Sequence, residues 1–472
     1  MKMNRRNFVK YGIGVGAALV IGSRIPGFQI NEALAAVQTL NITITDALKN
    51  MVTHNTINPA QCYFWIYKMS ADGTDIPAEV PGPNIFTTQG DTVSISIKND
   101  LDEPHAFSIP GIFDSGPIAP GKTLVTSFTA LKSGAFLYYD NLNAPVNRVM
   151  GLHGAFIVMP REPVLGHKFT PYDNPTPGVQ QLFDDFGSSA HYPGLAWQEG
   201  DLDPDSFAPP FRQYIWLLHQ ASPNLFAEVG NYTPGENYPA AQFMQKFLRD
   251  PFDAVKPTTN AIPQYFTING QSGHFSHNKP FICPNLRAGE PCVIHVLNAG
   301  LWTHSMHLHA NHFYVTSKNG VVSNNPIWID VYNIEPMDMV DYTVPYMRPP
   351  DVGNVRGIGM PDTPLTSLKG KPVWPPWEEI GMFMPKLGTL ADPLNPDSVE
   401  ISVQLSPLCY PMHDHSEPSQ TSQGGNYNLG MISGMNFTGD RNVLDALGGP
   451  TTFPNAPNVF GPEKTGPAAG PE

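Results

Sequence analysis

The sequence contains few charged residues, and few of them are basic. Asp, Glu, Lys and Arg make up 14% of the 472 residues, and 27 basic residues face 41 acidic ones, which gives a formal net charge of −14. Nucleic-acid binding relies on clustered Lys and Arg side chains that neutralise phosphates. No such cluster occurs beyond the amino-terminal segment, so we expect no nucleic acid as a partner.

The chain also lacks an apolar run long enough to span a membrane. The longest, from Tyr11 to Ile21, is shorter than the ~20 residues that a spanning helix needs. It follows the pair Arg5-Arg6 and precedes Ala33-Leu34-Ala35, a small-x-small pattern. Twin arginines in this layout are typical of a Tat export signal. We therefore expect a signal peptide over 1–36 and a mature protein that is periplasmic or extracellular, with no membrane span.

Cysteine is scarce, with four residues in the whole chain: Cys62, Cys283, Cys292 and Cys409. An oxidising compartment permits disulfides. Cys283 and Cys292 flank a turn and could face each other across a hairpin. Cys62 and Cys409 could pair only if the fold brings them together, which the sequence leaves open.

Turn-forming and aromatic residues are abundant instead. The chain has 50 Pro and 42 Gly, and 11% of its residues are aromatic, which indicates short strands joined by many loops. Residues Thr92 to Ile97 alternate strictly between polar and apolar side chains, as a half-buried strand does. The spacing of several such strands predicts a Greek-key β-sandwich.

The order of motifs then repeats. A Gly-acid turn, an alternating strand, an Asn and a His-bearing strand occur around Asn99 and again around Asn298, which indicates two homologous domains. The predicted organisation is a first domain over 37–160, an interdomain segment over 161–210, a second domain over 211–440 with a Pro-rich insertion at 343–398, and a flexible tail over 441–472.

Histidine pairs are the strongest chemical signal. His307 and His309 lie one residue apart on a predicted strand, so their side chains share a face. His413 and His415 form a second pair. A single strand histidine is usually an ordinary core or surface residue. Two same-face pairs on neighbouring strands instead predict four imidazoles around one metal ion, for which copper, zinc, iron and nickel are all suited.

Several motifs, in order, resemble the paired cupredoxin domains of the multicopper oxidases. Segments 82–93 and 266–298 resemble the domain cores, 304–313 resembles the family's His-rich strand, and 411–431 resembles its carboxyl-terminal copper motif. The resemblance covers 75–160 and 262–437. It implies an all-β fold of tandem cupredoxin-like Greek-key β-sandwich domains, with copper as the cofactor.

The resemblance also implies which copper sites are present. In the family, the His-rich strand gives ligands to type 1, type 2 and type 3 copper at positions that match His304, His307 and His309. The terminal motif is usually His-Cys-His, and here Asp414 takes the cysteine position. A type 1 site needs a thiolate, whereas Asp offers only hard oxygen. We therefore expect no type 1 copper, and an Asp414 side chain that points away from the metal.

The trinuclear cluster of that family uses two further His-x-His pairs in the first domain. Here His105 stands alone at the first of these, and residues 138–141 replace the second without a histidine. We expect one or two copper ions held by His307, His309, His413 and His415. Further candidate ligands are His304, His105 and His153. Two-domain relatives often form trimers with metal sites between subunits, but a site within one chain is equally expected.

Three functions follow as hypotheses. The first is an exported copper oxidoreductase with a mononuclear or dinuclear site, acting on a small molecule or metal ion rather than on bulky phenols. The second, favoured by the missing cysteine, is a metal-free cupredoxin-fold scaffold or binding protein of the cell envelope. The third is a periplasmic copper-tolerance protein that uses histidines and the methionines between Met337 and Met384.

Overall fold

The computed structural model describes residues 19–20, 39–51, 60–71, 74–186, 211–248, 265–273, 276, 282, 285–288, 292–309, 312–344, 408–421, 429–444 and 450–452. Most of the predicted signal peptide, of the Pro-rich insertion and of the tail lies outside these residues, as does Cys283, so the predictions about them stay predictions. Within the described part of the chain, no helix is long and apolar enough to cross a membrane.

The first half of the chain forms two β-sheets. The outer sheet has the strand order β4-β3-β2-β6-β9, and the inner sheet has the order β1-β5-β11-β10-β7-β8. Their strands are β1 (Leu19–Val20), β2 (Thr39–Met51), β3 (Ala60–Ala71), β4 (Thr74–Asp75), β5 (Ile85–Thr88), β6 (Thr92–Asn99), β7 (Ser108–Ile109), β8 (Phe113–Asp114), β9 (Thr123–Thr129), β10 (Gly134–Tyr139) and β11 (His153–Met159).

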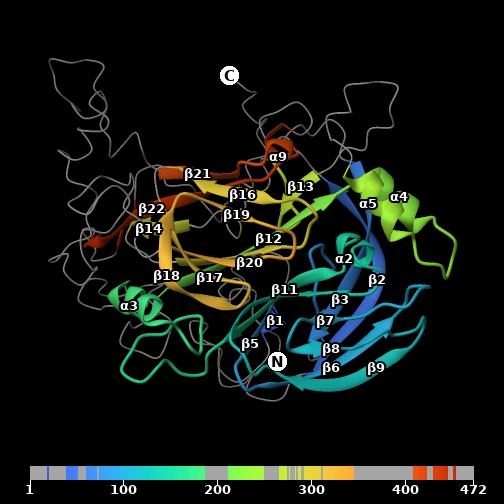
Figure 1. The fold of residues 1–472 in the computed structure, drawn as a ribbon, viewed down its shortest axis with the longest axis horizontal. Coiled ribbons are helices and arrows are strands. Elements are labelled where there is room, and N and C mark those ends of the chain that lie inside the picture. Colours follow the sequence, from blue (N-terminus) through green and yellow to red (C-terminus); the bar gives the residue numbers. More distant parts are fainter. Residues whose placement is uncertain are drawn as a thin grey trace.

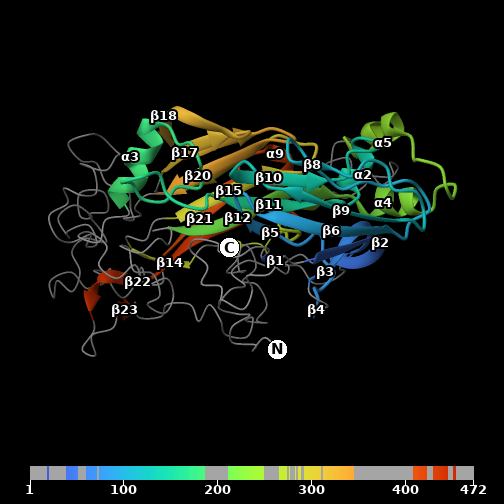
Figure 2. The same cartoon turned by 90° about the horizontal axis from the view of Figure 1, so that it is seen from below.

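The second half forms two more sheets. The inner one has the order β13-β12-β15-β20-β17-β18, and the outer one has β14-β22-β21-β16-β19, with β23 paired to β22. Their strands are β12 (Arg212–Ala221), β13 (Tyr265–Ile268), β14 (Asn285–Ala288), β15 (Cys292–Asn298), β16 (His304–Leu308), β17 (Phe313–Lys318), β18 (Val321–Ile329), β19 (Val331–Ile334), β20 (Met339–Val344), β21 (Leu408–Asp414), β22 (Ile432–Leu444) and β23 (Pro450–Thr452). Figures 1 and 2 show the two halves as separate, adjoining sets of strands.

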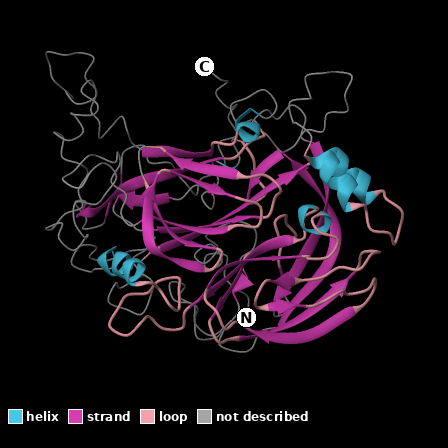
Figure 3. Ribbon diagram, viewed as in Figure 1, coloured by secondary structure: helices cyan, strands magenta, loops and turns pink. Residues whose placement is uncertain are grey.

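The described helices are short and lie between or beside the sheets (Figure 3). They are α2 (Val146–Val149), α3 (Pro177–Phe186), α4 (Pro223–Gly230), α5 (Ala240–Phe247) and α9 (Glu417–Thr421). Helix α3 falls in the predicted interdomain segment, 161–210. Its buried Val179 and Phe183 are four residues apart and so lie on one helical face.

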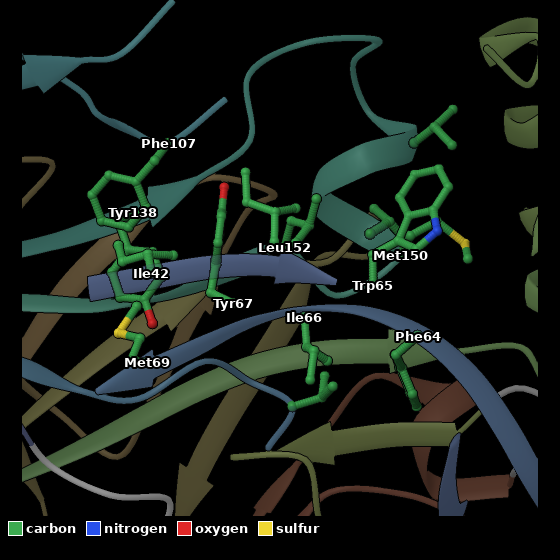
Figure 4. Packing of buried hydrophobic residues seen from close by; sticks show 14 of the residues in the cluster. Ile42, Phe64, Trp65, Ile66, Tyr67, Met69, Phe107, Tyr138, Met150 and Leu152 are labelled. Carbon is green, nitrogen blue, oxygen red and sulfur yellow. The ribbon is translucent and has the colours of Figure 1, made fainter. Parts of the chain in front are cut away.

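Side-chain alternation explains the outer sheet of the first half. Val93, Ile95 and Ile97 of β6 are at most 1% exposed, while the residues between them face outward. On β3, which β2 separates from β6, Tyr67 packs in the core beside Phe107 and Tyr138 (Figure 4). Burial of apolar area on this scale is the main stabilising term of the sandwich.

The central strands of the two inner sheets are buried on both faces. Every residue of β11 and every residue of β15 is buried, which is why these strands are almost continuously apolar. One hydrophobic cluster joins the halves: it includes Leu137 and Ile157 from the first and Ile215 and Leu297 from the second. The predicted all-β fold of tandem Greek-key sandwiches is confirmed, with the two sandwiches stacked into four layers.

Candidate metal centre

The candidate centre lies on the outer sheet of the second half, where β16 pairs with β19 on one side and β21 on the other (Figure 1). The burial of β16 alternates: His304, Met306 and Leu308 are buried, whereas Ser305 and His307 are less so. The apolar Met306 and Leu308 thus hold the strand against the core. His307 therefore faces away from that core, on the outer side of the sheet.

The register between the two strands brings the predicted histidine pairs together. His307 lies directly opposite His413, and Leu308 lies opposite Met412. Ring centroids are 5.5 Å apart for His307 and His413, 4.9 Å for His307 and His415, and 5.0 Å for His307 and His309. His413 is 4.8 Å from His309 and 4.9 Å from His415 by the same measure. The four imidazoles form one compact group, hereafter the four-histidine cluster.

Nitrogen spacing within this cluster suits a bound ion. The Nε2 atoms of His309 and His413 are 2.8 Å apart. Two neighbouring nitrogen ligands at about 90° around an ion, each with a bond of about 2.0 Å, would also be about 2.8 Å apart. One ring nitrogen from each of His307, His413 and His415 lies within 4.8 Å of the others. Three nitrogen ligands around one tetrahedral ion, with bonds of about 2.0 Å, are about 3.3 Å apart, so this set would close by up to about 1.5 Å.

Protonation and tautomer also favour metal binding. Burial, together with the neighbouring imidazoles, lowers the pKa of His413 to about 4. Burial and the nearby His307 and His415 also lower the pKa of His309. Neutral rings are the form that ligates metals. Nδ1 of His307 lies 3.0 Å from the carbonyl oxygen of Asp330, so an N–H there would leave Nε2 as the ligating atom.

His304 is not brought to this cluster, although the sequence analysis made it a candidate ligand. It lies on the buried face of β16, and both of its ring nitrogens are engaged: Nδ1 is 2.7 Å from Asp414 Oδ2, and Nε2 is 2.5 Å from Gln220 Nε2. An odd spacing between 304 and 307 puts the two side chains on opposite faces of a strand. Within this chain, His304 therefore belongs to the core rather than to the cluster.

Asp414 also faces the core. Its side chain is fully buried and accepts hydrogen bonds from the backbone N–H groups of Ser305 and Ser416, in addition to the contact with His304. The expected orientation away from the cluster is confirmed. Met431 packs into the hydrophobic core of the second half. The side chain of Cys409 lies outside the described residues.

The candidates in the first half, His105 and His153, have other partners. His105 is buried in the first sandwich, with Nδ1 2.7 Å from Asp140 Oδ2. His153 on β11 binds the carbonyl oxygen of Arg148 through Nδ1, at 2.8 Å, and its ring lies 4.4 Å from that of His219. Neither is joined to the four-histidine cluster.

A comparison of the two halves explains why the first half has no cluster of its own. The strand pair β7 and β10 of the first half corresponds to β16 and β21, and there Ser108 lies opposite Tyr139. These two residues stand where His307 and His413 face each other in the second half. The cluster is therefore confined to one half of the chain.

Sequence reasoning missed two residues that support the site. Gln220 comes from β12 on the opposite sheet and donates to His304, and the carbonyl group of Asp330 accepts from both His307 and the backbone N–H of Leu308. A backbone carbonyl and a distant amide carry no motif. Only the three-dimensional pairing of strands identifies them.

Comparison with known proteins gives a family. Two family models described as multicopper oxidase match residues 66–163 and 250–349. Multicopper oxidase MCE of Talaromyces pinophilus is 28% identical over 31% of this chain and 23% of its own length. A copper-containing nitrite reductase of Neorhizobium galegae is 32% identical over 22% of this chain and 28% of its own. Copper resistance protein A of Escherichia coli is 30% identical over 18% of this chain and 15% of its own length. The chain thus spans less than a third of the length of these relatives.

One solved structure with a similar fold is a blue copper oxidase from Nitrosomonas europaea. It is 15% identical, with a TM-score of 0.47, and the match covers 84% of this chain and 85% of that one. By these two matches, residues 66–163 and 250–349 are domains of the multicopper oxidase/cupredoxin superfamily, whose members bind copper.

Proposed function

We propose that this chain is an exported copper oxidoreductase whose centre is a mononuclear or dinuclear copper site held by the four-histidine cluster, without type 1 copper. The observation that carries the proposal is the strand register that sets His307 opposite His413. In this register the Nε2 atoms of His309 and His413 are 2.8 Å apart. Strand alternation and cross-strand pairing would hardly align two such pairs by chance.

Each part of the cluster has a role in this proposal. The imidazoles of His307, His413 and His415 would hold the ion, and His309 would complete the set or leave its place to a substrate. A bound copper ion would supply a redox-active Lewis acid at this point. The Asp330 carbonyl would hold the His307 ring in its orientation. Because His309 and His415 are exposed, a small molecule in solution could reach the centre directly.

The absence of type 1 copper is supported by the surroundings of Asp414. A carboxylate occupies the position between His413 and His415, and it is hydrogen-bonded to His304 and to the backbone N–H groups of Ser305 and Ser416. Without a thiolate–copper centre to pass single electrons inward, the reductant itself must reach the cluster. A small molecule or metal ion is therefore the substrate class we propose, rather than a bulky phenol.

The test is elemental analysis of the purified exported protein, with a visible spectrum. We expect one or two copper ions per chain and no intense thiolate–copper band. His307→Ala and His413→Ala should each lower the copper content severalfold. His167→Ala is the matched control, because His167 is a surface histidine paired with Asp184. Wild-type protein without copper, or unchanged copper in both cluster variants, would end the proposal. The mass of the native assembly tests the predicted homo-oligomer.

A metal-free envelope scaffold is the second candidate, and one observation favours it. Ser108 and Tyr139 stand in the first half where the second half has His307 and His413, so half of the family's imidazole positions are lost. If this alternative holds, the exported protein contains no stoichiometric metal. The cluster variants would then leave function in the cell unchanged.

A further inference from the structure

A buried polar corner is repeated in the two halves of the chain. In the first half, the amide of Asn99 donates to the carbonyl oxygens of Glu103 and Ile118, and its oxygen accepts from the N–H of Leu101. In the second half, Asn298 makes the same three bonds, with Trp302, Ile334 and Gly300. A histidine follows each Asn by the same interval, and these are His105 and His304.

Each of these histidines binds a buried aspartate at the end of a strand, where Asp140 follows β10 and Asp414 is the last residue of β21. The Nδ1–Oδ2 distance is 2.7 Å for His105 and Asp140, and again 2.7 Å for His304 and Asp414. In both copies, Oδ1 of the aspartate accepts from the backbone N–H two residues later along the chain. The two halves therefore contain the same His–Asp pair after the same Asn turn, although in the first half Asn147 also donates to Asp140 Oδ2, at 3.0 Å.

Only the second copy lies directly beneath the cluster. Asp414 separates His413 from His415, and its Oδ1 also accepts from the N–H of Ser305 on β16, at 2.8 Å. Next to that contact, the N–H of His415 donates to the carbonyl oxygen of Ser305, at 2.8 Å. Asp414 thus connects β21 to β16 at the point where both strands present their imidazoles.

His304 extends this connection across the sandwich. Gln220 Oε1 accepts from the N–H of Leu301, so the Gln220 amide nitrogen is the group that faces His304 Nε2. That nitrogen donates, hence Nε2 of His304 accepts and the ring proton lies on Nδ1, directed at Asp414. The result is a one-directional chain of hydrogen bonds from Gln220 on the inner sheet to Asp414 on the outer one.

We propose that the chain Gln220–His304–Asp414 is a positioning device for the four-histidine cluster, in which Asp414 sets the separation and register of β16 and β21 without touching the metal. The proposal rests on the proposed copper function. Outer residues that orient ligands affect affinity because they fix where the ligating nitrogens stand before the ion arrives. The first-half copy, which has no imidazoles above it, does the same for a strand pair without a metal site.

The duplication supplies a matched control. Asp414→Asn and Asp140→Asn each replace one oxygen of an equivalent buried carboxylate by a donor, so both should lower stability to a similar degree. Copper affinity is measured on the full chain by competition with a chelator, together with the electron paramagnetic resonance spectrum of the Cu(II) form. Asp414→Asn should weaken copper binding about 10- to 100-fold and alter the spectrum. Asp140→Asn should leave both at the wild-type values.

A second pair of variants covers the case in which Asp414→Asn does not fold. His304→Asn keeps an N–H close to the Nδ1 position and so keeps the bond to Asp414, whereas His304→Leu removes it. We expect near wild-type copper affinity for the first and a loss of about 10-fold or more for the second.

Three outcomes would overturn the inference. Equal copper affinity and spectra for Asp414→Asn and Asp140→Asn would show that the device plays no part in positioning. Loss of all copper in His304→Asn would show that His304 is itself a ligand. Both results leave the copper function standing, whereas a wild-type protein that binds no copper removes the proposed function and the positioning role together.

Discussion

Two buried histidines at the junction of the halves should make the stability of this protein depend on pH. His153 of β11 and His219 of β12 lie with their rings 4.4 Å apart, and both are nearly inaccessible to solvent. Burial lowers the pKa of His153 to about 3, and the guanidinium group of Arg148 acts in the same direction. Burial and the nearby His153 also lower the pKa of His219 far below its ordinary value.

Proton linkage gives the direction in which the free energy of unfolding changes with pH. In the unfolded chain, His153 takes up a proton near its ordinary pKa of 6.5, whereas in the folded chain it stays neutral down to about 3. Between these values the unfolded state binds more protons, so the free energy of unfolding falls as the pH falls. For one such histidine, the loss between pH 7 and pH 5 is about 2 kcal/mol. His219 adds a loss of the same order.

The assay is urea unfolding of the metal-free protein at pH 7, 6 and 5. His153→Asn keeps a donor near the Nδ1 position, towards the carbonyl oxygen of Arg148, but does not titrate. We expect its free energy of unfolding to be lower than that of the wild type at pH 7, yet to change by about 2 kcal/mol less on going to pH 5. His167→Asn, at an exposed histidine, is the control. If His153→Asn and the wild type show the same pH dependence, His153 does not stay neutral in the fold and the reasoning is wrong.

Two further predictions concern packing outside the cluster. Tyr172 donates to Asp341 Oδ2 at 2.7 Å and so ties the interdomain segment to the second half; Tyr172→Phe should lower the free energy of unfolding by about 1–3 kcal/mol, measured by urea titration. Gly154 faces the buried ring of Tyr138, and an added methyl group would come within 2.1 Å of the phenol oxygen. Gly154→Ala should therefore cost about 1–3 kcal/mol or more, and less when Tyr138 is first changed to Leu; equal costs in both backgrounds would contradict the overlap.

Residue patterns alone predicted much of this molecule. The alternation at Thr92–Ile97 matches a strand observed over Thr92–Asn99, and the outward face shared by His307 and His309 follows from the two-residue period of a strand. The same period predicted that Asp414 would point away from its histidine neighbours. These features depend on local geometry, which a single segment encodes.

Other features depend on pairing between distant segments. That His307 would lie opposite His413, rather than one residue to either side, is set by the register of two strands a hundred residues apart. Gln220 reaches His304 from the facing sheet, and no spacing in the sequence indicates that contact. The burial of β11 and β15 on both faces likewise follows from the stacking of the two sandwiches.

The structure places His304 apart from the four-histidine cluster. Its position in the His-rich strand matches a ligand of the family, yet the odd spacing from His307 already places it on the opposite face. With Asp414 in place of the family's cysteine, His304 forms a hydrogen bond to that carboxylate.

X-ray absorption at the copper edge of the copper-loaded protein tests the central claim most directly. We predict a first shell of nitrogen or oxygen scatterers at about 2.0 Å, with the outer-shell pattern of several imidazoles. In His413→Ala the imidazole contribution should fall. A sulfur scatterer at about 2.3 Å, or a first shell without imidazole, would contradict a copper centre built from the four histidines of β16 and β21 and their flanks.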